Sequence, residues 1–95
     1  MITAEQTHHI VREASCWSWW IRVHSPAKNE PVIYIGESDG DEPVKHVISW
    51  QEGIRLMLTG KHSINTKIFD VDDGGYADDA DKFLQLCVFG EVRYG

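Results

Sequence analysis

Apolar and polar residues alternate most regularly between residues 16 and 24. One side of this stretch carries Trp17, Trp19, Ile21 and Val23. The other side carries polar residues together with Trp20. A period of two residues is typical of a half-buried β-strand, and indole rings bury large apolar areas. The pattern therefore predicts a strand over 16–24 whose Trp17 and Trp19 face forms the seat of the core.

Three more segments have the composition or the alternation of β-strands, namely 32–37, 44–48 and 64–71. The first follows a turn-rich connection, which favours an antiparallel hairpin with the strand at 16–24. Two topologies stay open. If 44–48 is a strand, the chain crosses over into a fourth strand parallel to it, and the two acidic loops lie at opposite ends of the sheet. If 44–48 is only an extended lead into a helix, both loops lie at the same end.

The clearest helix signal is Ser49 followed three residues later by Glu52, which is the spacing of a capping box. Apolar residues then recur at helical spacing, at Trp50, Ile54, Met57 and Leu58. Gly60 offers a left-handed stop. The sequence therefore predicts a helix over about 50–59 that packs against the Trp17 and Trp19 face.

Both ends of the chain have two interpretations. Acidic residues from Asp78 onward favour the first turn of a helix that runs to about Phe89, although 87–94 also alternates like a final strand. Thr3 and Gln6 form a second capping-box pattern, which favours a helix over 2–14 against an edge strand at 8–13. We expect a helix in both places.

The elements together predict an α+β fold. We expect one domain over residues 1–95, because a chain of this length has room for one core. Its main part is expected to be an antiparallel sheet of three to four strands. The helix at about 50–59 and a C-terminal helix at about 78–89 are expected to pack on that sheet.

Charge narrows the classes of partner. The formal net charge is -6, and proteins that bind nucleic acid or anionic membranes need a basic surface. We therefore expect a protein partner with a basic surface, with no direct nucleic-acid contact and no membrane contact. The apolar runs are short and the two cysteines show no metal-ligand spacing, which favours a cytoplasmic protein with reduced thiols.

Most of the acidic residues fall in two clusters. The first consists of Glu37, Asp39, Asp41 and Glu42. The second consists of Asp70, Asp72, Asp73, Asp78, Asp79 and Asp81. Turns and helix starts favour aspartate for local reasons, which explains part of this enrichment. The functional interpretation is an electronegative surface for a basic partner or a cation.

The second cluster also has the spacing of a calcium loop. Over residues 70–81, carboxylates or a backbone carbonyl fall at ligand positions at Asp70, Asp72, Tyr76, Asp78 and Asp81, and Gly75 falls at the sharp turn. These twelve residues resemble a degenerate EF-hand loop, which implies a calcium-responsive module. Gly74 replaces a carboxylate ligand, and Asp81 is shorter than the usual bidentate glutamate. An acidic turn that begins a helix is the simpler interpretation.

The polar side of the strand at 16–24 carries Trp20, Arg22 and His24. If the sheet is covered on both faces, Trp20 belongs to the core. If one face is open, Trp20 lies in an aromatic patch beside the acidic loops, which is how a protein-binding hot spot is composed. A small ligand-binding domain or enzyme built on these three residues is an alternative, although the sequence offers no positioned nucleophile and no phosphate loop.

The function predicted from the sequence is a non-catalytic small acidic binding protein, an inhibitor or immunity-type module. The residues expected to contact its partner are Trp20, Arg22, His24, Glu37, Asp39, Asp41, Glu42, Asp72, Asp73, Asp78 and Asp79. No catalytic residue, cofactor or metal is predicted in this interpretation. Self-association into a homodimer through the Trp20 face is compatible with it.

Overall fold

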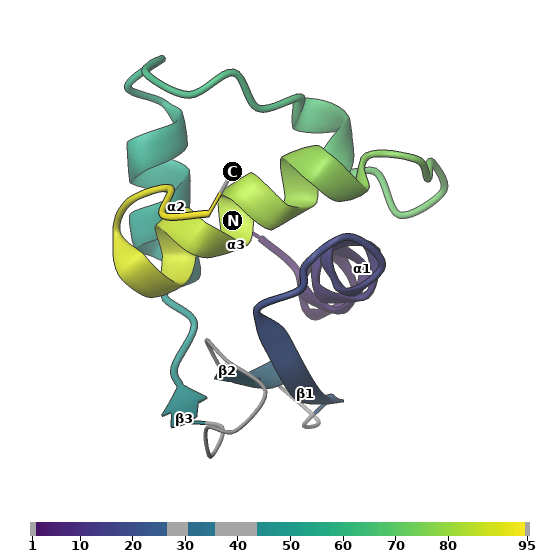
Figure 1. The fold of residues 1–95 in the computed structure, drawn as a ribbon. Helices are drawn as coiled ribbons and strands as arrows, with labels where there is room; N and C mark the ends of the chain where they lie inside the picture. Colours follow the sequence, from purple (N-terminus) through teal and green to yellow (C-terminus); the bar gives the residue numbers. More distant parts are fainter. Residues whose placement is uncertain (1, 27–30, 36–43, 95) are drawn as a thin grey trace.

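The computed structural model describes the backbone of residues 2–26, 31–35 and 44–94, and the side chains of residues 2–21 and 46–94. Within these ranges the chain forms α1 (Ala4–Ser15), α2 (Trp50–Met57) and α3 (Ala77–Phe89). A short 3-10 helix, η1 (Thr66–Phe69), precedes α3. Helix α3 crosses the middle of the molecule and packs against both α1 and α2 (Figure 1).

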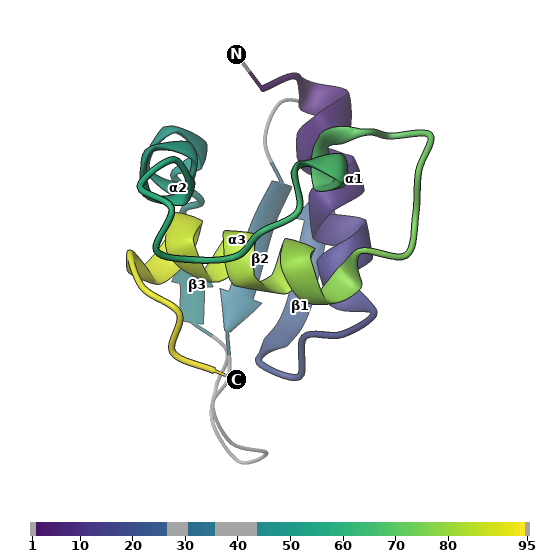
Figure 2. The ribbon, with the colours of Figure 1, turned by 90° about the horizontal axis from the view of Figure 1, so that it is seen from above.

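The strands are β1 (Ile21–Pro26), β2 (Pro31–Ile35) and β3 (Val44–His46). They form an antiparallel sheet in the order β1-β2-β3. Ile35 of β2 lies opposite Ile21 on one side and Val44 on the other. Helix α1 contacts β1 and β2, and all three α-helices lie on one side of the sheet (Figures 1 and 2).

The prediction of a sheet-dominated α+β fold is wrong, because the described part of the chain is mainly helical. The α-helices hold 12, 8 and 13 residues, whereas the strands hold only 6, 5 and 3. The buried apolar cluster lies on the α-helices, with Trp20, Ile48 and Ile68 as its other members. Among the residues whose side chains are described, the core therefore forms mainly between helices that meet across α3.

Helix α1 begins as its sequence predicts. The Thr3 hydroxyl accepts a hydrogen bond from the Gln6 backbone N–H at 3.1 Å, and the Gln6 side chain accepts one from the Thr3 N–H at 2.8 Å. This reciprocal pair satisfies two backbone donors that a helix start leaves unpaired. Ile10, Val11 and Ala14 are buried on the helix face toward the core. The alternative of an edge strand at 8–13 is wrong.

The helices expected at about 50–59 and 78–89 are present as α2 and α3, with two differences at α2. The Ser49 side chain makes no capping hydrogen bond, so the predicted capping box does not form; instead the Ser49 N–H donates to the Cys87 carbonyl at 3.0 Å. The helix also ends at Met57, before the expected end. Helix α3 ends at Gly90, whose φ of 74° is left-handed, so the alternative of a final strand over 87–94 is wrong.

The strand predicted at 64–71 is also wrong. Ile68 is buried within the 3-10 helix η1, and the Asn65 side chain accepts a hydrogen bond from the Lys67 N–H at 2.9 Å. This local bond favours a tight turn over an extended ladder. The described residues 46–94 therefore contain no fourth strand, and the predicted parallel crossover does not occur.

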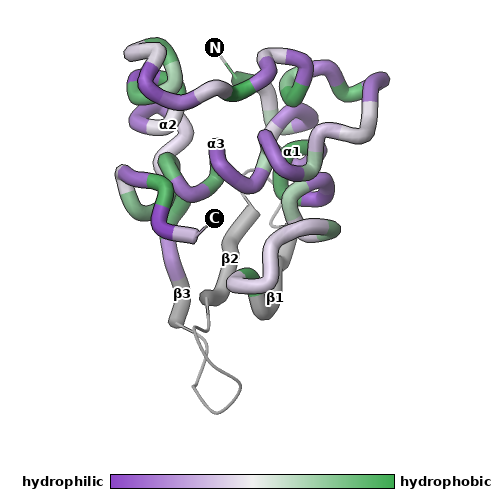
Figure 3. The backbone as a smooth tube through the Cα atoms, turned by 45° about the horizontal axis from the view of Figure 1, so that its top comes forward, coloured by the Kyte–Doolittle hydropathy of each residue, from purple (hydrophilic) through white to green (hydrophobic). Residues whose placement is uncertain are grey.

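Hydropathy follows the helical packing. Figure 3 shows hydrophobic and hydrophilic positions alternating along α1, α2 and α3, as expected for short helices that bury one side. Among the residues that the structure describes, the helices are too short and too polar for any of them to cross a bilayer.

Candidate functional site: the tryptophan turn

Residues 16–20 form a turn, which we call the tryptophan turn, between the end of α1 and the start of β1. The backbone N–H groups of Trp17 and Ser18 donate to the Ala14 carbonyl at 2.9 and 2.7 Å. These bonds use a carbonyl that the end of a helix leaves unpaired. The predicted strand over 16–24 is therefore wrong for its first half, and regular strand begins only at Ile21.

Two side chains of the turn face inward and bind the same carboxylate. The Trp20 indole N–H donates to Oδ1 of Asp81 at 2.6 Å, and the Ser18 hydroxyl donates to the same oxygen. Trp20 has no exposed surface, and Ser18 and Asp81 are also buried. Asp81 on α3 therefore supplies the acceptor that a buried indole N–H favours, and the bond fixes Trp20 in the core.

Trp17 and Trp19 face outward as a result. Their side chains are 59% and 57% exposed, which is the reverse of the predicted core face. Large apolar side chains that remain this exposed on one turn are a feature of interaction surfaces. The turn therefore presents two indoles to solvent on a backbone that its neighbours Ser18 and Trp20 hold against α3.

The network continues from Asp81 to the C-terminal segment through Gln85, which has no exposed surface. The Gln85 side-chain NH₂ group donates to Oδ2 of Asp81 at 2.8 Å and to the Tyr94 carbonyl at 2.9 Å. Its side-chain oxygen accepts hydrogen bonds from the N–H groups of Arg93 and Tyr94, both at 2.7 Å. One buried amide thus holds residues 93–94 beside the tryptophan turn.

Aromatic rings join the turn to this segment. The ring of Tyr94 lies 4.8 Å from that of Trp19 and 6.0 Å from that of Trp20, measured between centroids. The Phe89 ring lies 5.8 Å from Tyr94, and the Arg93 guanidinium carbon lies 4.5 Å from the centroid of Phe89. These contacts make Trp19 part of a packed aromatic cluster, although more than half of it is exposed.

The structure separates the residues predicted to bind a partner. Trp20 is buried, so it is a packing residue and not an exposed anchor, and a site built on the Trp20, Arg22 and His24 face loses its central member. Arg22 and His24 lie on β1, but their side chains are outside the described residues. The cluster of Glu37, Asp39, Asp41 and Glu42 also lies outside them.

The second acidic cluster lies in the loop before α3 and in the first two turns of that helix. Asp72 and Asp78 are exposed, whereas Asp73 and Asp79 are half-buried. The loop is attached to α1, because the Gly75 N–H donates to Oε1 of Glu13 at 3.1 Å. Asp72 and Asp78 are thus available at the surface, while Asp81 of the same cluster is buried.

The calcium loop suggested by residues 70–81 is not supported by this geometry. Its last ligand would be Asp81, whose two oxygens already accept hydrogen bonds from Ser18, Trp20 and Gln85. Oδ1 of Asp70 accepts a hydrogen bond from the Asp72 N–H at 3.0 Å, which is an ordinary aspartate turn. Among the described residues, no group of three or more histidine, cysteine or acidic side chains is placed to hold a metal ion.

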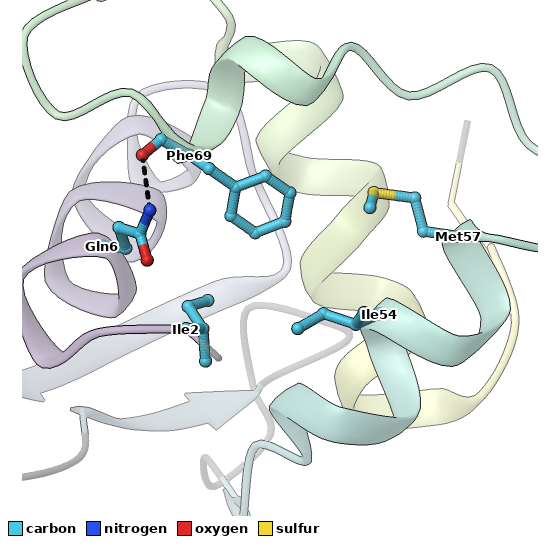
Figure 4. Close-up of a pocket in the computed structure, with 5 residues that line it drawn as sticks. All are labelled: Ile2, Gln6, Ile54, Met57 and Phe69. Atoms are coloured by element: carbon cyan, nitrogen blue, oxygen red, sulfur yellow. Dashed lines mark hydrogen bonds between the residues drawn. The ribbon is translucent and has the colours of Figure 1, made fainter.

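A hollow of about 210 Å³ lies between the start of α1, the end of α2 and η1 (Figure 4). It is lined by Ile2, Gln6, Ile54, Met57 and Phe69. The Gln6 amide is already engaged, because its NH₂ group donates to the Phe69 carbonyl at 3.0 Å and its oxygen accepts from Thr3. The hollow is therefore lined mainly by apolar side chains, and the polar side chain in its lining, Gln6, already has hydrogen-bond partners.

Cys87 is not placed as a nucleophile. Its thiol packs against Gly53, where α2 meets α3, and burial raises its pKa far above the ordinary value for a thiol. The thiolate is the reactive form of cysteine, and a raised pKa keeps the thiol protonated. Cys87 is therefore a packing residue of the core.

Sequence reasoning assigned Trp17 and Trp19 to the core and did not single out Gln85 and Tyr94. The regular alternation did separate two faces of the turn, so the signal was present. It could not say which face was buried, because the deciding acceptor, Asp81, is distant in sequence. Comparison of the chain with family models, with curated proteins and with solved structures finds no match.

Proposed function

We propose that this chain is a non-catalytic acidic binding protein, an inhibitor or immunity-type module that engages a basic protein surface with Trp17 and Trp19 as its aromatic anchors. The observation that carries the proposal is the exposure of these two indoles on one turn, at 59% and 57%. Tryptophan is among the residues that contribute most to binding energy in protein interfaces.

The attachment of the turn supports this role. Ser18 and Trp20 alternate with the exposed indoles and bind Asp81, so the turn is held on both sides of Trp19. Tyr94 packs against Trp19 from the C-terminal segment. A site held in its binding geometry before the partner arrives loses less conformational entropy on association.

Charge supports the choice of partner. The chain carries a net charge of -6, and Asp72 and Asp78 are exposed. Opposite charge accelerates association and selects partners, while buried aromatic contacts supply the affinity. Glu37, Asp39, Asp41 and Glu42 remain predicted contacts of the same electronegative surface. Nucleic acids and anionic membranes are disfavoured by the same charge.

The proposal includes a cytoplasmic location. Cys16 is exposed and Cys87 is buried, and both are free thiols. Free thiols persist in reducing compartments.

The test is affinity capture with three forms of the chain, the wild type, Trp17→Ala/Trp19→Ala and Leu58→Ala. Leu58 is 76% exposed, so its substitution is a matched control for the loss of exposed apolar surface. We expect a basic protein that the wild type and Leu58→Ala retain and that the double variant loses. With that protein purified, association should slow as salt concentration rises.

Equal capture by the wild type and the double variant would refute the role of the two indoles. Sedimentation of the purified chain tests the alternative that the two indoles bind a second copy of this chain. A dimer that the double variant abolishes, with no basic protein captured, would replace the proposed function with self-association.

A further inference from the structure

Residues 93–94 are held by main-chain hydrogen bonds and ring contacts of the kind that bind a peptide segment. We define the Tyr94 slot as the surface formed by Trp19, Trp20, Gln85 and Phe89, which contact Arg93 and Tyr94. We propose that this slot docks a partner segment in which a basic residue precedes an aromatic residue, and that Arg93 and Tyr94 occupy it as an intramolecular competitor. This inference rests on the proposed function and names the partner chemistry at the same site.

The main-chain part of the recognition is independent of sequence. Gln85 accepts from two consecutive backbone N–H groups and donates to one backbone carbonyl. Any peptide that has N–H groups at these two positions carries the same atoms. The orientation of the amide is determined by Asp81, because a carboxylate can only accept and the Gln85 NH₂ group must therefore face it. The Gln85 oxygen is left facing the segment.

The ring of Tyr94 supplies the selective part. Trp19 meets it edge to face, with an interplanar angle of 67°, while Trp20 lies nearly parallel to it at 28°. Phe89 meets it at 79°. Three rings around a fourth favour an aromatic occupant, since each aromatic pair contributes about 0.5–1.5 kcal/mol beyond the buried area.

Charge selects the residue before the aromatic one. The Arg93 guanidinium lies over the face of Phe89, a cation–π contact. The chain as a whole is acidic, so a cationic side chain at this position is also favoured by the long-range field. The basic partner of the proposed function therefore has a specific way to engage the slot, through an Arg-Tyr pair or a similar one.

Exchange of the two occupants is structurally simple. Helix α3 ends at Gly90, and residues 91–94 form neither helix nor strand, so leaving the slot breaks no secondary structure. A tethered occupant competes at an effective concentration on the order of millimolar for a short flexible link. The free slot should therefore bind a peptide far better than the occupied one.

The test uses a fluorescein-labelled peptide with the sequence of residues 89–95, Phe-Gly-Glu-Val-Arg-Tyr-Gly, and fluorescence anisotropy. We expect Tyr94→Ala to bind this peptide at least about tenfold more tightly than the wild type, because the competing ring is removed. A peptide with alanine in place of its tyrosine should lose this binding. Equal affinity of the wild type and Tyr94→Ala for the first peptide would overturn the inference.

A matched pair of second substitutions locates the binding. In the Tyr94→Ala background, Trp19→Ala removes a wall of the slot and should abolish peptide binding, whereas Trp17→Ala should leave it within about twofold. Both indoles are similarly exposed, so neither substitution opens the core. Equal effects of the two would contradict the assignment to the slot.

A second measurement covers the case in which Tyr94→Ala does not fold. Millimolar peptide added to ¹⁵N-labelled wild type should shift the Gln85 side-chain amide and the Tyr94 backbone amide, and the absence of both shifts would overturn the inference. Its failure is distinguishable from that of the proposed function. Capture of a basic partner through Trp17 and Trp19 without peptide binding refutes the slot alone, and peptide binding without a captured partner refutes the function alone.

Discussion

Replacement of Asp81 by alanine should release the tryptophan turn from α3. In the native structure the Asp81 carboxylate accepts hydrogen bonds from Trp20, Ser18 and Gln85 in a buried setting. Hydrogen bonds to a charged group contribute about 1.5–3 kcal/mol each, and a buried donor left without a partner costs about 1–3 kcal/mol.

The expected loss is smaller than the sum of these terms. The Ser18 hydroxyl can rotate, and the Gln85 amide keeps its bond to the Tyr94 carbonyl. The Trp20 indole N–H has no such freedom, because its ring is fully buried. We therefore expect Asp81→Ala to lower the free energy of unfolding by about 3 kcal/mol, most of it from the stranded indole. This is a large share of the ~5–15 kcal/mol typical of a domain.

The assay is urea unfolding followed by circular dichroism, with Asp78→Ala as the control on the same helix. Asp78 is exposed and lies 3.9 Å from the Lys82 ammonium, so its loss should cost below about 1 kcal/mol. Asp81→Asn should fall between them, because its oxygen can still serve Trp20 while its NH₂ group faces the NH₂ group of Gln85. In NMR spectra, the Trp20 indole N–H should exchange slowly in the wild type and quickly in Asp81→Ala.

The reasoning fails if Asp81→Ala and Asp78→Ala are equally stable. It also fails if the indole N–H groups of Trp17 and Trp19 exchange as slowly as that of Trp20 in the wild type, because protection is expected only where the indole is buried and bonded.

Four further predictions concern the helices and the thiols. Gly53→Ala would place a Cβ 2.1 Å from the Cys87 sulfur, so it should destabilise the fold by about 1–3 kcal/mol in thermal unfolding, and Cys87→Ala in the same chain should relieve part of that loss. Thr3→Ala removes the capping box of α1 and should cost about 0.5–2 kcal/mol, with Thr3→Ser as the variant that keeps the cap. A thiol reagent at mildly alkaline pH should label the exposed Cys16 and spare Cys87 until the chain unfolds. The folded-state pKa of Cys87 is raised, so the stabilisation from its protonated thiol is present below the pKa of the unfolded thiol and should be lost as pH rises above that value. Cys87→Ala should abolish this part of the pH dependence of the free energy of unfolding.

Local interactions explain the parts of the fold that the sequence predicted well. The Thr3 and Gln6 box starts α1, acidic residues fill the first turn of α3, and Gly90 ends α3 in a left-handed conformation. Each of these features depends on residues within one helical turn. Local patterns also misled, because the Ser49 and Glu52 spacing forms no capping box and alternation at 64–71 suggested a strand where a local Asn65 bond favours a 3-10 turn.

The candidate site depended on distant partners. The alternation over residues 16–24 placed Trp17 and Trp19 on one side and Ser18 and Trp20 on the other, and the large rings suggested that Trp17 and Trp19 were the buried pair. Only the tertiary structure brings Asp81 within 2.6 Å of the Trp20 indole, and this acceptor reverses the assignment. The same hydrogen bonds engage both oxygens of Asp81, which the spacing had suggested as the last ligand of a calcium loop.

The sequence by itself thus determined the acidic character of the protein, the start of α1 and the start and end of α3, because these follow from composition and from neighbours along the chain. The tertiary structure decided which tryptophans meet solvent and where residues 93–94 lie. Burying a polar group without a hydrogen-bond partner costs free energy, and α3 supplies the partners of Trp20 and of the C-terminal segment, Asp81 and Gln85.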